Sequence, residues 1–197
     1  MGKLMLPPYL APVASVISQR NDADEAVVAL RVTCTCNGEE FVVRYAGRAG
    51  DRFTTAERCG EDLELAIAAE CPSCGQTHLL FDRRRHGWGP VLFPAGSQPP
   101  QSPVKSISHQ NIDIFQKDRM SHGRGRVVWH CRYCGSTRHE IEIDIGWSPF
   151  AEVAEELKDR PDFNESVWIE AFETIQINLS CAGCGQETTH WVQFEVV

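Results

Sequence analysis

Cysteines are the residues of this chain with the clearest capacity for chemistry, and there are nine of them. Six form three copies of a C-x-x-C-G motif, which begin at Cys71, Cys131 and Cys181. A C-x-x-C turn lets two thiolates converge on one metal ion, and the following glycine can adopt the positive φ that turns the chain back. A fourth pair, Cys34 and Cys36, has a single residue between its members. The four pairs predict a protein that metal ions hold together.

Two cysteine pairs supply the four thiolates that surround a structural zinc ion, at about 2.3 Å and in tetrahedral geometry. We therefore expect two structural Zn²⁺ ions. We call each cysteine pair with its turn a knuckle and number the four in chain order. Spacing alone does not assign the partners, because Gly87-Trp88-Gly89-Pro90 follows the second knuckle much as Gly146-Trp147-Ser148-Pro149 follows the third, so that more than one register of duplication fits the sequence. A Pro/Gly-rich stretch in mid-chain favours sequential pairing. The expected ligands are Cys34, Cys36, Cys71 and Cys74 for the first ion, and Cys131, Cys134, Cys181 and Cys184 for the second.

Other side chains compete for these sites. Cys59 could substitute for Cys34 or Cys36, although a small buried hydrophobic residue is the favoured interpretation. His78, His139 and His190 each follow a knuckle within a few residues and could replace or shield a thiolate. Because the paired cysteines already supply four ligands, we favour strand histidines near the metal sites, and we interpret His130 in the same way.

The segments around the cysteines alternate as β-strands do. A strand over 26–33 leads into Cys34, the Asn37-Gly38 turn follows, and a strand over 40–45 returns, which predicts the opening hairpin of a zinc ribbon. Further strands are expected at 63–69, 76–81, 127–130, 140–145, 174–180 and 188–197. Ser148-Pro149 predicts the start of an amphipathic helix that ends before Pro161.

These elements predict a β-rich, α+β protein made of two related zinc-ribbon units of antiparallel hairpins, with a short helical insert in the second. Gly-Gln-Thr-His after Cys74 and Gly-Gln-Glu-Thr-Thr-His after the Cys181 knuckle begin alike, which indicates an internal duplication. The expected organisation is an N-terminal arm over 1–25, a first unit over 26–94, a linker over 95–125 and a second unit over 126–197.

The charge and the composition of the chain restrict the classes of function that we expect. The chain has 197 residues, 42% of them hydrophobic, and a net charge of −8, which opposes non-specific attraction to phosphates. Pro7, Pro8 and Pro12 interrupt the apolar helix that a signal peptide needs, and no stretch reaches the length of a membrane span. We therefore expect a cytoplasmic protein with reduced thiols that bind metal and no contact with a membrane.

Enzyme motifs are absent from the sequence: there is no H-x-E, H-E-x-x-H, P-loop or G-x-S-x-G. Cys71-Pro72-Ser73-Cys74 could be a thiol redox pair, but that chemistry needs a helix after the motif, and a strand is predicted there. We expect a non-catalytic adaptor or regulatory module that binds another macromolecule, in first place a protein. The alternative is nucleic-acid binding, whose candidate contacts are Arg83, Arg84, Arg85, Arg124 and Arg126.

The paired knuckles of the second half resemble those of zinc-ribbon proteins with rubredoxin-like knuckles. The segment from Cys131 to Cys184, with its strand and its proline-started helix, is also similar to the bacterial CpXC domain, in which two C-P-x-C motifs flank such an insert. The chain departs from that pattern at Arg132 and Ala182, where the family has proline, and Pro72 alone keeps that form. The resemblance implies a fold context and no particular activity.

Overall fold

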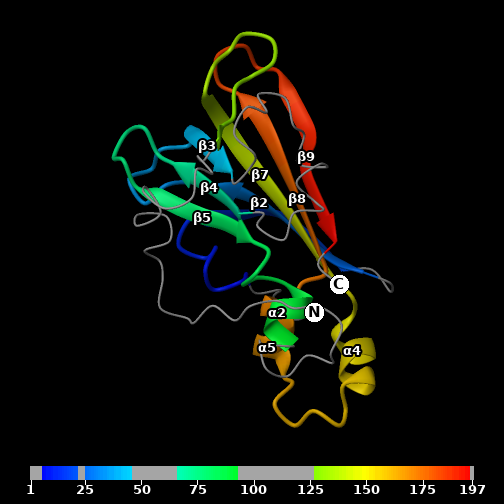
Figure 1. Cartoon of the computed structure of the whole chain (residues 1–197). Helices are drawn as coiled ribbons and strands as arrows, with labels where there is room; N and C mark the ends of the chain where they lie inside the picture. Colours follow the sequence, from blue (N-terminus) through cyan, green and yellow to red (C-terminus); the bar gives the residue numbers. More distant parts are fainter. Residues whose placement is uncertain (1–5, 22–24, 46–65, 93–126, 196–197) are drawn as a thin grey trace.

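The computed structural model describes residues 6–21, 25–45, 66–92 and 127–195 (Figure 1). Its strands form one antiparallel sheet, and the helices lie together at one end of it. The β-rich, α+β class is thereby confirmed. The strands are β1 (Ala14–Asn21), β2 (Ala26–Val32), β3 (Phe41–Tyr45), β4 (Ala66–Glu70), β5 (Thr77–Asp82), β6 (Val127–Val128), β7 (Arg138–Trp147), β8 (Thr174–Cys181) and β9 (Glu187–Glu195), and the helices are α2 (Trp88–Leu92), α4 (Phe150–Glu156) and α5 (Glu165–Glu170).

The long strand β7 occupies the middle of the sheet. One of its edges pairs with β8. The other edge pairs with β3 at the start of β7, where Phe41 lies opposite His139, and with β2 further along β7. The strands β2 and β3 therefore follow one another along β7 and, within the described residues, do not pair together. The predicted opening hairpin is wrong, because β2 and β3 both pair antiparallel with β7 and therefore run in the same direction. In the loop between them, the Cys34 N–H donates to the carbonyl of Gly38 at 2.8 Å.

The strand β3 repeats this arrangement. One edge pairs with β4, and the other pairs with β7 and then with β6, where Tyr45 lies opposite Val127. The segment β6–loop–β7 therefore repeats β2–loop–β3, about a pseudo-two-fold axis near the Phe41–His139 pair. The hairpins β4–β5 and β8–β9 each contain a register shift at the corresponding place. The first strand of each half thus pairs with the central strand of the other half: β2 pairs with β7, and β6 pairs with β3.

Alternating side chains of the central strands build the core. Every second residue of β2 and of most of β7 is buried, as period-two alternation requires. The strand β1 extends the sheet beside β2, and its residues after Ala14 are exposed. Among the described residues, no helix combines the length and the apolar character needed to cross a bilayer. The largest fully buried side chains are Trp129, Trp147, Phe41, Phe81 and Phe172.

The helical insert between β7 and β8 is joined to the sheet through indole groups. The Trp147 Nε1–H donates to the carbonyl of Ile169 at 3.1 Å, and the Trp168 Nε1–H donates to the carbonyl of Ser148 at 2.9 Å. Ser148 is not the helix cap that the sequence predicts, because its hydroxyl donates to the Glu173 carboxylate at 2.8 Å, and α4 begins at Phe150 instead.

Candidate metal centres

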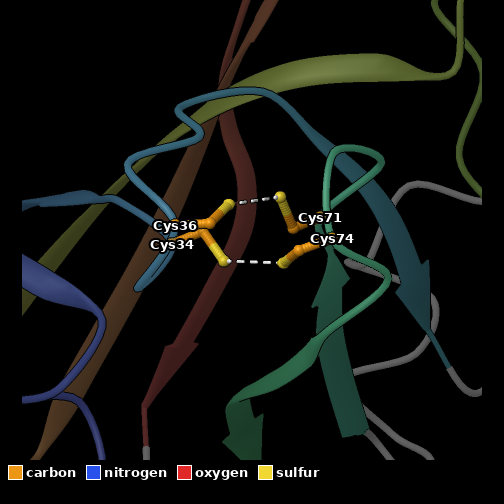
Figure 2. A group of neighbouring side chains, drawn as sticks. All are labelled: Cys34, Cys36, Cys71 and Cys74. Carbon is orange, nitrogen blue, oxygen red and sulfur yellow. Dashed lines mark hydrogen bonds between the residues drawn. The ribbon is translucent and has the colours of Figure 1, made fainter.

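The first cysteine cluster lies between two loops of the first half. Cys34 and Cys36 come from the loop between β2 and β3, and Cys71 and Cys74 come from the turn between β4 and β5. Figure 2 shows the two pairs of sulfurs facing one another across a small gap. The Sγ atoms of Cys34 and Cys74 are 3.5 Å apart, and those of Cys36 and Cys71 are 3.6 Å apart.

The second cluster has the same plan and lies at the start of β7, where Cys181 is opposite His139. Cys131 and Cys134 come from the loop between β6 and β7, and Cys181 and Cys184 from the turn between β8 and β9. The Sγ atoms of Cys131 and Cys184 are 3.7 Å apart, and those of Cys134 and Cys181 are 3.5 Å apart. The structure thus brings together the same two sets of four that sequential pairing predicts.

The sulfur spacing fits a metal ion and excludes disulfides. Four thiolates at about 2.3 Å from a tetrahedral ion are separated by about 3.8 Å, whereas a disulfide bond is about 2.05 Å long. All four sulfurs of each cluster lie within 4.8 Å of one another, and all eight cysteines are free thiols. Two groups of four cysteines could therefore each hold one metal ion.

Three of the knuckles share one backbone conformation. In each, the N–H of the first cysteine donates to the carbonyl five residues later, and the glycine N–H donates back to the carbonyl of that cysteine. The glycines Gly75, Gly135 and Gly185 have φ angles of 75°, 75° and 71°, in the left-handed region that favours glycine.

The first knuckle, which has one residue fewer between its cysteines, is closed in a similar way. Asn37, with φ of 66°, takes the place of the glycine, and its N–H donates to the carbonyl of Cys34 at 2.8 Å. Asparagine tolerates this conformation better than most residues do. The C-x-C spacing therefore still presents two converging sulfurs. Asn37 closes this knuckle, whereas the sequence indicated it only as part of a turn. Cys59, the candidate substitute ligand, lies outside the described residues.

Backbone donors shape the acidity of the thiols. Burial alone would raise the pKa of Cys71, but the N–H groups of Cys74 and Ser73, together with nearby thiols, lower it to about 6. The pKa of Cys181 is lowered to about 6 in the same way, against burial, by the N–H groups of Cys184 and Gly183 and by nearby thiols. Each cluster thus contains a buried cysteine that ionises readily, as metal ligation requires.

The histidines occupy different positions relative to the clusters. The Nε2 atom of His78 lies 3.2 Å from the Cys34 Sγ, close enough to donate a hydrogen bond to that sulfur. His139 is buried opposite Phe41, and its Nδ1 lies 3.2 Å from the carbonyl oxygen of Thr137. His190 lies in the bulge of β9, where its backbone N–H donates to the Asn178 side chain. His78 is therefore a neighbour of the first cluster, which already has four sulfurs.

The arginine triplet after β5 follows an acidic side chain, Asp82, that two of its residues contact. The Arg84 N–H donates to the Asp82 carboxylate at 3.0 Å, and the Arg85 Nε lies 3.4 Å from it. His86, whose Nδ1 accepts the Asp82 N–H, stacks on Tyr9 with ring centroids 3.7 Å apart. Arg84 is exposed, whereas Arg83 and Arg85 are partly buried. His86, directly after the triplet, thus contacts the N-terminal segment through Tyr9. Arg124 and Arg126 lie outside the described residues.

Gly38 is the glycine on which the first cluster depends most directly. A Cβ at this position would lie 2.9 Å from the Cys71 Sγ and 3.5 Å from the Cys36 Sγ. We expect Gly38→Ala to displace a sulfur and to weaken zinc binding at the first site at least about tenfold, since 1.4 kcal/mol suffices for that change. Competition with a chromogenic chelator measures the affinity.

Gly135→Ala is the matched control for this prediction. Its φ is also unfavourable for alanine, but no atom lies within 4 Å of the added Cβ. It should cost about 1 kcal/mol of stability through backbone strain, without displacing a sulfur. Equal zinc affinity at the first site in wild type and Gly38→Ala would show that the contact is not limiting.

Comparisons with protein-family models, with curated proteins and with solved structures give no match to this chain. The fold and the clusters therefore define its class by themselves. The protein is an antiparallel β-rich α+β protein with two groups of four cysteines that could bind metal. The resemblances to zinc ribbons and to the CpXC domain stay predictions.

Proposed function

We propose that the protein is a non-catalytic, zinc-ribbon-type adaptor or regulatory module that holds two structural zinc ions and binds a protein partner. The observation that carries this proposal is the completeness of both clusters, in which four cysteine sulfurs lie at the spacing of tetrahedral zinc coordination. Catalytic zinc sites normally have three protein ligands and an open position, whereas four thiolates close the site.

The donor set favours zinc among the abundant metals. Thiolates are soft ligands, which select zinc, copper(I) or iron–sulfur chemistry over magnesium, calcium or manganese. Zinc has no preferred geometry that the protein must overcome and takes four thiolates readily. Iron in the same four-sulfur setting would give visible absorbance, so a spectrum separates the two metals.

The surroundings of the knuckles support a structural role. The second, third and fourth knuckles are each followed by a strand, namely β5, β7 and β9. None of these cysteine pairs therefore begins a helix whose N-terminus could activate a thiol for redox exchange.

The charge distribution supports a protein partner over nucleic acid. The Arg85 guanidinium lies 3.4 Å from the Asp82 carboxylate, and the chain carries a net charge of −8. Phosphate binding relies on accessible cations and on a favourable overall field. A salt-dependent shift of labelled RNA or DNA that Arg83→Ala, Arg84→Ala and Arg85→Ala together abolish would favour the alternative.

Metal analysis tests the proposal directly. Protein purified without chelator should contain two zinc ions per chain and lack visible absorbance from iron, because the two clusters are complete. Removing the zinc should abolish the cooperative unfolding transition, since structural zinc binding contributes directly to folding free energy. Fewer than one zinc per chain would contradict the proposal, and so would small-molecule turnover that persists with cadmium in place of zinc.

A further inference from the structure

The tip of the third knuckle carries large, exposed side chains. Tyr133 is 75% exposed, more than any other large hydrophobic residue of the described part of the chain. Arg132, beside it, and His130 and Arg138, on either side of the knuckle, are exposed as well. We name these four residues the knuckle-tip patch.

The knuckle turn itself does not require these side chains. The two residues between the cysteines are Pro72 and Ser73 in the second knuckle, and Ala182 and Gly183 in the fourth. All three knuckles have the same backbone hydrogen bonds and the same positive φ at the following glycine. Small residues therefore satisfy this turn, so neither the arginine nor the tyrosine is needed to form it.

Two residues of the patch, Arg132 and His130, are held in place before any partner arrives. The Arg132 Cζ lies 5.7 Å from the ring centroid of Trp129, which is 1% exposed, so a cation–π contact positions the guanidinium. The His130 Nδ1 lies 3.3 Å from the carbonyl oxygen of Gly135, within the knuckle. Binding through a preorganised surface loses little side-chain entropy, and tyrosine and arginine are the residues that most often dominate interface energies.

The charges around the patch select the chemistry of the partner. Arg132 and Arg138 present cations on a chain whose net charge is −8. Arg138 also lines a polar hollow of about 450 Å³ together with Glu39, Glu40 and Glu140, and it lies 3.6 Å from the Glu40 carboxylate. A phosphate backbone would meet these carboxylates and be repelled. A single carboxylate beside an apolar group would meet Arg132 and Tyr133 without that repulsion.

We propose that the knuckle-tip patch docks a protein segment that carries an Asp or Glu next to an apolar or aromatic side chain. Arg132 binds the carboxylate through its planar guanidinium, and Tyr133 covers the apolar neighbour. This inference rests on the proposed function, because it names the surface and the partner chemistry of a protein-binding module.

Peptide selection tests the patch. A random peptide library displayed on phage is selected on the zinc-loaded full chain, with counter-selection on the double variant Arg132→Ala, Tyr133→Gly, which places alanine and glycine there, as in the fourth knuckle. We expect enriched peptides with an acidic residue beside an apolar one. Synthetic copies should bind wild type at least about tenfold more tightly than the double variant, because hot-spot truncations commonly cost that much.

Three controls keep the test decisive. Arg132→Glu should abolish binding with zinc content unchanged, whereas Pro72→Ala with Ser73→Gly, the same replacement in the second knuckle, should leave binding intact. Zinc is measured in every variant, so loss of metal, which would count against the proposed function, is distinguished from loss of docking. Equal peptide binding by wild type and double variant, the absence of an acidic consensus, or Tyr133-dependent binding of a labelled single-stranded oligonucleotide would overturn the inference.

Discussion

Cys181→Ser is expected to empty the second metal site and to weaken the first one as well. The loss at the second site follows because a serine hydroxyl is a poor substitute for a thiolate. The zinc contribution in small domains, about 10–16 kcal/mol, exceeds or matches the usual stability of a whole domain, about 5–15 kcal/mol. We therefore expect the C-terminal half to unfold, which thermal unfolding followed by circular dichroism measures.

The effect on the first site follows from the shared strands. Cys34 and Cys36 lie on the loop between β2 and β3, and both of these strands pair with β7 of the other half. When β7 loses its order, this loop loses the strands that fix its position. Cys71→Ser, at the equivalent place in the first half, should weaken the second site in return, because β6 pairs with β3.

Ala182→Ser is the matched control, since it introduces the same residue into the same knuckle without removing a sulfur. It should retain two zinc ions and the wild-type unfolding temperature. Zinc affinity at the first site of Cys181→Ser, measured by chelator competition, should fall at least about tenfold. An unchanged first site would show that the halves fold and bind metal independently. An unchanged unfolding temperature would show that the second site is dispensable.

Trp147→Ala is expected to cost about 3–5 kcal/mol, the usual range for a buried large aromatic residue. The side chain is 1% exposed, and its ring lies 5.9 Å from Trp168 and 6.4 Å from Phe172 between centroids. Its loss removes the indole donor to Ile169 and leaves a cavity where the helical insert meets the sheet. Urea denaturation measures the change in the free energy of unfolding.

Phe150→Ala provides the comparison within the same insert. This side chain is 37% exposed, so its truncation should cost about 1 kcal/mol, near the average for a point mutation. Zinc content should stay at two ions per chain in both variants, provided that they are folded under the assay conditions. Equal losses in Trp147→Ala and Phe150→Ala would contradict the role of Trp147 as the anchor of the insert.

Local patterns in the sequence were sufficient for the strands around the cysteines and for the knuckles, whereas β1 (Ala14–Asn21) falls in the segment that the sequence predicts to be an N-terminal arm. Alternation such as Ile141, Ile143 and Ile145 reports which side of a strand is buried, because side chains in a strand alternate between its faces. The C-x-x-C-G spacing defines the knuckle turn, because the glycine supplies the positive φ that closes it. Both patterns depend only on residues that are close together in the sequence, so they can be recognised without the tertiary structure.

The partners of each strand required the tertiary structure. Whether β3 turns back on β2 or follows it along the same neighbour depends on β7, which lies about a hundred residues further along the chain. Nothing in the local pattern encodes that pairing. The same holds for Arg83, Arg84 and Arg85, because the sequence displays three cations but not the ion pair between Arg85 and Asp82.

The sequence by itself therefore determined the four knuckles, their thiol chemistry and the β-rich class, since these follow from residue type and short spacing. Only the tertiary structure decided that the two halves exchange strands and that eight sulfurs close into two clusters. It also decided that Tyr133 stands exposed at one knuckle tip. The physical reason is that exposure and convergence depend on distances between segments far apart in the chain, which spacing along the chain does not specify.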